Sequence, residues 1–233
     1  MAELLYEGKA KQVYLTDKDD EYLIHYKDDA TAGNGVKHDQ FEGKGVLNNT
    51  ISCIIFDMLE EAGIKTHMIK KLNERDILVK KVDIFPLEVI IRNITTGSFC
   101  KRLGAPEGVV LEEPIFEISY KNDDYGDPLI NEDHAVALKL CTREEYNFIK
   151  QETLKINELL KEFFLSLNLK LVDFKIEFGK TPDGEILLAD EISPDSCRLW
   201  DVETNQKYDK DVFRQDIGDL IETYKAVLAR MQK

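Results

Sequence analysis

Two common nucleotide-binding signatures are missing from this chain of 233 residues. The sequence contains neither the P-loop pattern GxxxxGKS/T nor the glycine-rich pattern GxGxxG. This removes the two commonest ways of cradling a nucleotide phosphate. A nucleotide site in this chain therefore has to be built from other residues.

Cysteine pairs and excess positive charge are also missing. Cys53, Cys100, Cys141 and Cys197 are far apart and show no CxxC or zinc-site spacing, which indicates four reduced thiols in a cytosolic protein. The formal net charge is −14, which argues against a surface for nucleic acid or for an anionic membrane. A local basic pocket for a small phosphate ligand stays compatible with that charge.

Long apolar runs are the third absence. No run is long enough to cross a bilayer, and the opening MAELLYEGKAK carries charges where a signal peptide would be apolar. We therefore expect a soluble protein of the cytoplasm. Hydrophobic residues make up 43% of the chain, which is enough for one large domain or two small lobes without a metal or disulfide to hold them.

The order of the apolar patterns predicts an α+β fold and not the regular alternation of a doubly wound sheet. Strands are expected at residues 4–16, 21–29, 66–93 and 108–123, with breaks at 73–76, Pro86 and Pro114. Helices are expected at residues 45–63, 97–104, 142–168 and 212–232. Thr142 and Glu145 have the spacing of a capping box. The polar segment 30–45 holds four glycines and is expected to be a functional surface loop.

Residues 171–178 alternate strictly between apolar and charged side chains. A strand places every second side chain on one face, so Asp173, Lys175 and Glu177 should form a charged row opposite an apolar face. After a turn at 179–184, the returning strand brings Asp190 and Glu191 close to that row. A solvated edge strand would alternate in the same way, but the apolar face and the second acidic pair favour a bound cation. Grouped carboxylates suit a Mg²⁺ ion that also binds phosphate oxygens.

Two further clusters carry positive charge. The segment YEGKAKQVY, residues 6–14, places a glycine and two lysines at a strand–turn–strand, where they could cover nucleotide phosphates. Arg92 ends an apolar strand, and Gly97 and Ser98 begin a short helix after it. Arg198 follows the turn SPD. Arginines beside a helix start form a good anion site, so this cluster suggests a second substrate that carries a phosphate.

Taken together, these motifs resemble the phosphoribosylaminoimidazole-succinocarboxamide synthase family, the SAICAR synthetases of purine biosynthesis. The two longest similarities resemble the family's signature stretches and read IFPLEVIIRNITTGS and LVDFKIEFG. Shorter similarities are YEGKAK, VLNN, LVKKVD, KNDDYGDPLI and ADEISPDSCRLWD, and TAGNGVKHDQ resembles a mobile loop of the bacterial enzymes. The similarity runs from about residue 5 to the C-terminus.

The resemblance implies a SAICAR synthase-like fold of two lobes with a kinase- or ATP-grasp-like cleft for ATP. A β-rich lobe would comprise residues 1–83, and an α+β lobe with the metal and ribonucleotide sites would comprise residues 84–233. The implied ligase joins the carboxylate of carboxyaminoimidazole ribonucleotide (CAIR) to the amine of L-aspartate through an acyl phosphate. It gives SAICAR and converts ATP to ADP and phosphate. ATP and Mg²⁺ are the implied cofactors. The implied partners are these small molecules, and neither nucleic acid nor a membrane is implied. A homodimer is compatible with the resemblance.

The resemblance also implies roles for individual residues. The residues implied to contact ATP are Gly8, Lys9, Ala10 and Lys11 over the phosphates, Val13, and the backbone of Lys80, Lys81 and Val82 at adenine. Mg²⁺ would bind Glu177 and Asp190. The alternation of the hairpin leaves open whether Asp190 or Glu191 shares the face of Glu177, and the resemblance favours Asp190. Lys175 would stabilise the transferring phosphoryl group, with Asp173 orienting it.

The remaining roles concern the other substrates. The residues implied to hold the 5′-phosphate of the ribonucleotide are Arg92, Ser98 and Arg198, with Asp195 and Ser196 near its base or ribose. Lys37 and Lys121 are candidates for binding aspartate. The four histidines, which form no ligand pattern and are expected to be structural, are His25, His38, His67 and His134.

Two other classes of protein share parts of this pattern. A small-molecule kinase on a similar fold would share every ATP-binding residue but would leave the phosphoryl group on its product. A non-catalytic nucleotide-binding or scaffold protein would tolerate the loss of Lys175 or Asp190, and both residues are present here.

Overall fold

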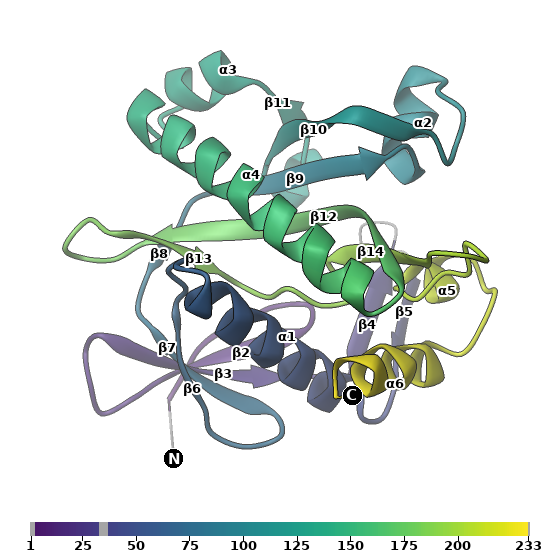
Figure 1. Cartoon of the computed structure of the whole chain (residues 1–233). Coiled ribbons are helices and arrows are strands. Elements are labelled where there is room, and N and C mark those ends of the chain that lie inside the picture. The colour runs from purple at the N-terminus through teal and green to yellow at the C-terminus, as the bar shows by residue number, and fades with distance from the viewer. Residues whose placement is uncertain (1–2, 33–36, 233) are drawn as a thin grey trace.

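The computed structural model describes residues 3–32 and 37–232, which form two antiparallel sheets, a two-stranded ribbon and the helices that cover them (Figure 1). The first sheet has the strand order β1–β2–β3–β7–β6. Its strands are β1 (Leu4–Glu7), β2 (Lys11–Leu15), β3 (Glu21–Tyr26), β6 (Met68–Lys71) and β7 (Asp76–Lys80). The ribbon pairs β4 (Asp29–Ala32) with β5 (Lys37–Gln40).

The second sheet contains the predicted charged strand. Its order is β11–β10–β9–β12–β13, and β8 and β14 also pair with β12. The strands are β8 (Asp83–Ile84), β9 (Leu87–Ile94), β10 (Val110–Tyr120), β11 (Leu129–Ile130), β12 (Leu169–Lys180), β13 (Ile186–Ala189) and β14 (Cys197–Asp201). All described strands of the first sheet precede residue 81 and those of the second follow residue 82, so a division near residue 83 remains our proposal.

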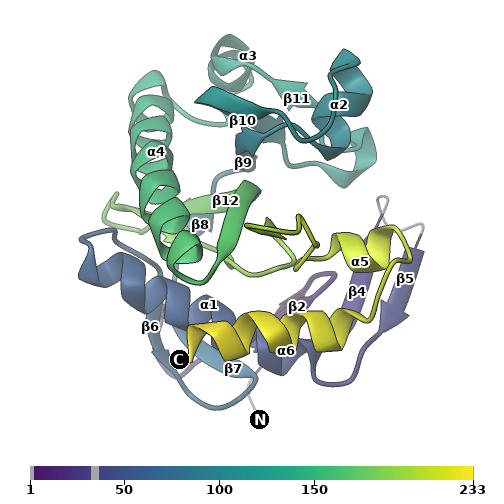
Figure 2. The ribbon, with the colours of Figure 1, turned by 45° about the vertical axis from the view of Figure 1, so that its right-hand side comes forward.

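The helices are α1 (Lys44–Glu61), α2 (Gly97–Leu103), α3 (Glu132–Ala137), α4 (Arg143–Ser166), α5 (Asp211–Arg214) and α6 (Leu220–Met231), with a 3₁₀ turn η1 at Asp123–Tyr125. Helix α6 at the C-terminus packs along α1, as both views show (Figures 1 and 2). No helix in the described part of the chain is long and apolar enough to cross a membrane.

Local signals in the sequence set the ends of the two long helices. Gly63 adopts φ +89° just after α1, and the N–H groups of Gly63 and Ile64 donate to carbonyls of the last helical turn. This is the glycine-terminated helix end that the sequence predicts. At the start of α4, Thr142 and Glu145 form the predicted capping box.

Strand β12 lies inside its sheet and is not a solvated edge strand, because β9, β13, β14 and β8 all pair with it. Its apolar side chains Phe174, Ile176 and Phe178 are buried in the main core. Helix α4 packs on β12 and β9 and buries Ile156 and Phe164 in the same core. Each fully buried side chain of this size contributes roughly 1.5–3 kcal/mol, so the alternation in β12 is enforced by the core.

Two predictions of secondary structure are wrong. The expected loop at 30–45 contains the paired ends of β4 and β5. The ribbon is largely polar and lacks the apolar alternation that reveals a half-buried strand. The expected helix at 212–232 is two helices, because Asp216 has φ +54° and the side chain of Asp219 caps the start of α6. The sequence reasoning also missed α3, β11 and β14, which are short.

The two sheets meet at residues 65–67 and 188. The N–H of His67 donates to the carbonyl of Leu188 (2.8 Å), and the N–H of Leu188 donates to the carbonyl of Lys65 (3.0 Å). The carbonyl of His67 accepts from the N–H of Lys80 (2.7 Å). These bonds hold the end of β7 beside β13. The place where the two sheets meet forms the floor of a cleft, which His67 and Lys80 line.

Candidate active site

A cleft of about 700 Å³ lies between the β1–β2 turn and the β12–β13 hairpin. Sequence-predicted site residues that line it are Gly8, Lys9, Ala10, Lys11, Val13, Lys80, Val82, Lys121, Lys175, Glu177, Asp190, Asp195 and Ser196. Predicted residues that do not line it are Lys81, Arg92, Ser98, Asp173 and Arg198. The fold therefore gathers the expected nucleotide and metal residues and leaves the arginines beside them.

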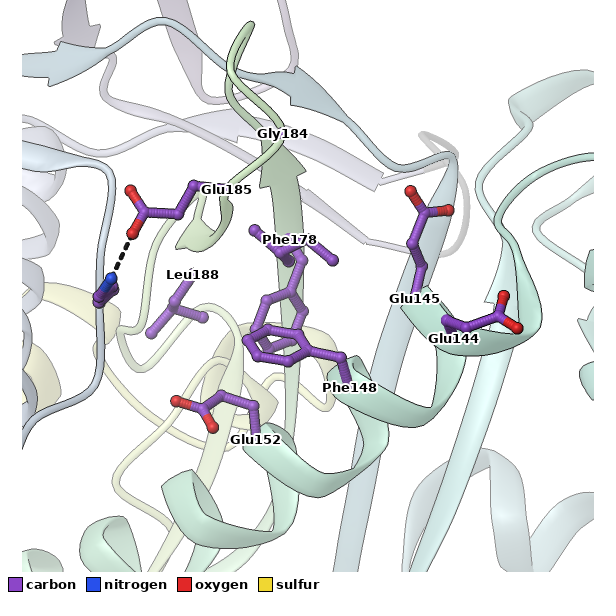
Figure 3. A pocket seen from close by; sticks show the side chains of 10 residues that line it. Glu144, Glu145, Phe148, Glu152, Phe178, Gly184, Glu185 and Leu188 are labelled. Atoms are coloured by element: carbon purple, nitrogen blue, oxygen red, sulfur yellow. Dashed lines mark hydrogen bonds and ion pairs between the residues drawn. The ribbon is translucent and has the colours of Figure 1, made fainter.

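A second hollow of about 470 Å³ lies between α4 and the other face of the hairpin (Figure 3). Phe178 and Leu188 form apolar walls, and Phe148 projects from α4 toward them. Its ionisable lining consists of Glu144, Glu145, Glu152, Glu185 and Lys65. Four carboxylates against one ammonium disfavour a nucleotide phosphate in this second hollow.

The β1–β2 turn carries two lysines that reach across the cleft. Lys9 contacts Asp123 (2.7 Å). Lys11 contacts Asp190 and lies 3.1 Å from Oε2 of Glu191. Burial opposes the charge of Lys11, but these two carboxylates outweigh it and raise its pKa well above the usual value. Both ends of the predicted phosphate cover are thus held by acids of the opposite wall.

The hairpin presents two buried acids, Glu177 and Glu191, and the partly exposed Asp190 at the cleft. Oε2 of Glu177 accepts from Lys121 (2.5 Å), and its Oε1 lies 3.3 Å from Nζ of Lys175. Glu177 pairs with Ala189, the last residue of β13. Asp190 then turns into the left-handed region with φ +63°. Strand alternation therefore does not apply to Asp190 and Glu191, and both reach the same lysine.

Lys175 and Asp173 do not contact each other, so the orienting role expected for Asp173 is wrong. Lys175 donates to Glu88 on β9 (2.9 Å) and to Glu177. Burial opposes its charge, but Glu177 and Glu88 raise its pKa above the usual value. Oδ2 of Asp173 instead accepts from Arg92 (3.1 Å) and Arg198 (2.8 Å). The sequence reasoning missed Glu88, which only the pairing of β9 with β12 places there.

The two arginines form a cluster with Ser98 beside the cleft. Nη2 of Arg92 donates to Ser98 Oγ (3.1 Å), and Arg198 also donates to Asp211 (3.0 Å). Gly97 has φ +57°, and a Cβ there would lie 2.8 Å from Arg198 Nη2. Only glycine therefore allows the backbone to approach this guanidinium. Helix α2 is short, so the arginines and not the helix start provide the positive charge.

Asp195 lies in a buried network that the sequence did not reveal. Its Oδ2 accepts from Lys44 (2.6 Å), a lysine with 0% side-chain exposure, and its Oδ1 accepts from Tyr224. Lys210 lines the cleft 3.5 Å from Oδ2. Burial raises the pKa of Asp195, but Lys44 and Lys210 outweigh it and hold the pKa below its usual value. Burial also lowers the pKa of Lys210.

The two aspartate-binding candidates lie in different places. Lys121 lines the cleft and contacts Glu177. Lys37 is outside it, where its ammonium donates to the carbonyl of Phe213 and to Asp216 at 2.5 Å each.

The histidines also differ from one another. His25 contacts Asp76 (2.6 Å), His38 contacts Asp29 (2.9 Å), and His134 belongs to the cap of α3. His67 is buried yet lines the cleft. Burial, aided by the nearby Lys11 charge, lowers its pKa to about 4.

No group of three or more His, Cys, Asp or Glu side chains in residues 3–32 and 37–232 is arranged to hold a metal ion. Mg²⁺ bound to a nucleotide needs only one or two carboxylates, since phosphate oxygens and waters complete its shell. Glu177 and Asp190 line the same cleft, beside Glu191, whose Oε2 lies 3.1 Å from the Lys11 ammonium. This donor set of hard oxygens fits such an ion.

Comparison with known proteins decides the family. A family model described as SAICAR synthetase matches residues 4–231. The chain belongs to the SAICAR synthetase family. A phosphoribosylaminoimidazole-succinocarboxamide synthase of Finegoldia magna is 68% identical over 230 residues, covering 99% of each chain. One of Caldanaerobacter subterraneus subsp. tengcongensis is 59% identical over 231 residues, covering 99% of this chain and 98% of the relative.

Solved SAICAR synthetases share the fold. The crystal structure of the Ehrlichia chaffeensis phosphoribosylaminoimidazole-succinocarboxamide synthase superposes with a TM-score of 0.96 at 45% identity, covering 99% of this chain and 98% of the other. A SAICAR synthetase in complex with ADP superposes with a TM-score of 0.94 at 50% identity, covering 97% and 96%. These similarities confirm the predicted family and α+β fold and disfavour the alternative of a small-molecule kinase.

Proposed function

We propose that this chain joins the carboxylate of CAIR to the amine of L-aspartate and converts ATP to ADP and phosphate. The chain is a member of the SAICAR synthetase family. The observation that carries the proposal is the convergence of four charged groups in one cleft. Lys11, Lys175, Glu177 and Asp190 come from the β1–β2 turn and the β12–β13 hairpin and line one cleft. A fold without phosphoryl chemistry would have no need to gather these charges in one cleft.

The reaction explains why the site is so highly charged. A carboxylate is a poor electrophile, so an amine does not attack it until one oxygen becomes a good leaving group. Transfer of the γ-phosphoryl group of ATP to that oxygen gives an acyl phosphate, and the amine of aspartate then displaces phosphate. Positive groups that neutralise charge on the moving phosphoryl group lower the barrier to both steps.

Within this proposal, Lys175 neutralises the phosphoryl group as it moves on and off the carboxylate. Glu88 and Glu177 hold the ammonium in place. The turn from Gly8 to Lys11, including Ala10, covers the ATP phosphates. Glu177 and Asp190 hold Mg²⁺, which would neutralise the phosphate oxygens when bound.

The adenine ring would enter the apolar part of the cleft. This part is lined by Val13, Ile24, Val79, Val82 and Ile84. The backbone from Lys80 through Lys81 to Val82 borders it, between the last strand of the first sheet and β8.

The ribonucleotide phosphate would bind Arg92, Ser98 and Arg198. Each guanidinium is held by carboxylates in the structure, so its planar fork is already oriented for an oxyanion. Asp173 acts in this proposal by orienting the arginines. Asp195 and Ser196 lie on the cleft wall next to β14 and would contact the base or ribose. Lys121 remains the proposed contact for aspartate, and a homodimer stays part of the proposal.

Isotope transfer tests the reaction directly. CAIR labelled with ¹⁸O in its carboxylate should deliver one label to inorganic phosphate, and net phosphate release should require aspartate. Unlabelled phosphate would exclude the acyl phosphate. A stable phosphorylated product formed without aspartate would instead support a kinase.

A further inference from the structure

Two lysines share one carboxylate in the wall of the cleft. Oδ2 of Asp195 accepts from Nζ of Lys44 (2.6 Å) and from Nζ of Lys210 (3.5 Å), and its Oδ1 accepts from the hydroxyl of Tyr224. Asp195 and Lys210 line the cleft, whereas Lys44 and Tyr224 do not. We call these four side chains the Asp195 cluster.

The Asp195 cluster joins separate parts of the fold. Lys44 begins α1 and Tyr224 belongs to α6, and these two helices pack together (Figure 2). The N–H of Lys210 donates to the carbonyl of Pro194 (3.0 Å), the residue before Asp195. The carboxylate is therefore held by two helices, and Lys210 is held beside it.

One positive charge of the cluster has no counter-charge. The side chains of Lys44 and Lys210 are 0% and 11% exposed, so water solvates neither ammonium well. Asp195 is the only ion-pair partner of either lysine among the described residues, and its single negative charge is shared between them. Burial of an ammonium without a compensating charge is costly, and a bound anion would relieve that cost.

The nearby acids do not supply the missing charge, because they have partners of their own. Glu191 lies 3.1 Å from the ammonium of Lys11. Asp211 pairs with Arg198 (3.0 Å) and with Arg214 (2.8 Å). The lysine of the cluster that lines the cleft therefore keeps an uncompensated charge.

Lys210 also has hydrogen-bond donors to spare. The long bond to Asp195 is the one hydrogen bond of its Nζ among the described residues, and an ammonium has more N–H groups than this bond uses. Lys44 has no exposed side-chain surface and cannot reach a ligand. Of the two lysines, only Lys210 is placed to bind an anion in the cleft.

The position of Lys210 indicates which anion it would bind. Its neighbour Asp211 holds Arg198 of the proposed 5′-phosphate site. Its ion-pair partner precedes Ser196, whose carbonyl accepts from the N–H of Lys175 (2.8 Å). Lys210 thus lies between that site and the lysine proposed for phosphoryl transfer. The phosphates have other partners in the proposed function, so the anions that remain are the carboxylates of CAIR and L-aspartate.

We propose that Lys210 is a further substrate-binding residue whose ammonium contacts a substrate carboxylate. Lys44 is a positioning residue, because it acts through Asp195 and compensates that carboxylate so that the charge of Lys210 stays available. The inference deepens the proposed function and rests on it in one respect, that CAIR and L-aspartate meet in this cleft.

Steady-state kinetics of the full chain, with each substrate varied, tests the contact. Lys210→Met should raise the KM for CAIR or for L-aspartate about 30-fold or more, because a desolvated charge pair is lost. The KM for ATP should stay within about twofold. Lys210→Arg, which keeps the charge, should stay within about fivefold of the wild type. Lys210→Gln takes the place of the methionine variant if circular dichroism shows that the latter is unfolded.

Lys207→Met is the matched control. Lys207 precedes α5, its side chain is 18% exposed, and it does not line the cleft. The substitution removes a partly buried ammonium of the same region, so it should change no KM by more than about twofold.

Titration calorimetry identifies the carboxylate. If it belongs to CAIR, Lys210→Met should weaken binding of CAIR and leave binding of the decarboxylated ribonucleotide unchanged. If it belongs to L-aspartate, both ribonucleotides should bind as they do to the wild type, and only the KM for L-aspartate should rise. Equal weakening of both ribonucleotides would place Lys210 at the ribose or phosphate and overturn the proposal.

Lys44→Met tests the positioning role. Without Lys44, Asp195 compensates Lys210 alone, so the KM that rises in Lys210→Met should also rise, by about tenfold. General damage to the fold would raise the KM for ATP as well. If Lys44→Met does not fold, Tyr224→Phe decides, since it loses only the hydroxyl bond to Asp195 and should raise the same KM about threefold.

The outcomes separate this inference from the proposed function. Folded Lys210→Met protein with wild-type KM values for CAIR and L-aspartate would refute the inference and leave the ligase proposal standing. A change confined to the KM for ATP would do the same. Unchanged KM values in folded Lys44→Met protein would refute the positioning role. Wild-type protein that forms no product from CAIR, L-aspartate and ATP would refute the proposed function itself.

Discussion

The two faces of the β12–β13 hairpin use similar residues under opposite conditions. On the cleft face, the side chain of Glu177 is 3% exposed where it meets Lys121 and Lys175, and Asp190 meets Lys11, which is 13% exposed. On the side toward α4, Glu185 of the hairpin pairs with Lys65 and Glu152 of α4 pairs with Lys155, and these two lysines are 69% and 66% exposed. The two faces contain the same types of charged residue. They differ in how much solvent reaches the ion pairs.

This difference has an energetic consequence. Exposed ion pairs contribute about 0–1 kcal/mol, because water and salt screen them. Removing one partner of a buried pair leaves a charge without compensation and costs about 3–5 kcal/mol. Substitutions of the same chemical type should therefore have very different effects on the two faces.

The largest effect is expected from Asp190→Asn. Asparagine is nearly isosteric and tolerates the positive φ of this position, so the fold should persist, as circular dichroism would show. Removing the charge at the proposed metal site should lower kcat by about 10²–10³-fold. Glu185→Gln on the other face of the same hairpin is the control and should change kcat less than twofold. Near-normal activity of Asp190→Asn at saturating Mg²⁺ would contradict the assignment.

Arg198→Ala should have the next largest effect. Loss of one partner in a desolvated charge pair costs roughly 2–5 kcal/mol, so the KM for CAIR should rise about 30-fold or more with the KM for ATP little changed. Steady-state kinetics with each substrate varied would measure this. Arg230→Ala removes an arginine that pairs with Asp201 on the same strand and should leave both KM values alone. A change in the ATP KM only would move Arg198 to the nucleotide.

A smaller effect concerns pH, through the buried Asp209 behind Arg198. Burial and the charge of Asp211 raise the pKa of Asp209 to about 7. The folded state therefore holds a proton that the unfolded chain loses near pH 4. Stability from this group is present at low pH and declines as pH rises from about 4 to 7.

Asp209→Asn should abolish that decline. The free energy of unfolding of the wild type, relative to the variant, should fall by roughly 2 kcal/mol between pH 4.5 and 7.5, allowing for relaxation around the charge. Urea unfolding at each pH would measure it. If the free energy of unfolding changed with pH in the same way for the two proteins, the raised pKa of Asp209 would be contradicted.

The smallest effects are expected in the hollow of Figure 3. Glu144→Gln and Phe148→Ser alter exposed lining residues and should change the free energy of unfolding by about 0.5 kcal/mol or less. Ligase activity should stay within twofold of the wild type. A tenfold loss of activity would mean that this face communicates with the cleft and that the contrast between the faces is false.

Much of the fold follows from short-range signals. Gly63 ends α1 and Thr142 with Glu145 starts α4, because each acts on backbone groups within a few residues. The ribbon of β4 and β5 escaped prediction since its strands are short and polar. The break between α5 and α6 depends on the positive φ of Asp216, which an apolar periodicity does not report.

The site divides in the same way. The charged row of β12 and the lysines of the first turn are readable, because alternation and turn residues are local. The partner of Asp173 was predicted wrongly, since arginines from β9 and β14 reach it. Lys44 and Asp195 are separated by 151 positions, and nothing near either residue announces the pair.

The sequence by itself determined the long helices α1 and α4, which face of β12 is charged and which family the motifs resemble. Only the tertiary structure decided which charges lie together in the cleft and which arginines share Asp173. Hydrogen bonds within helices and turns join near neighbours, so local residues specify them. The contacts of the site join distant segments, so the partner of each charge depends on how those segments pack.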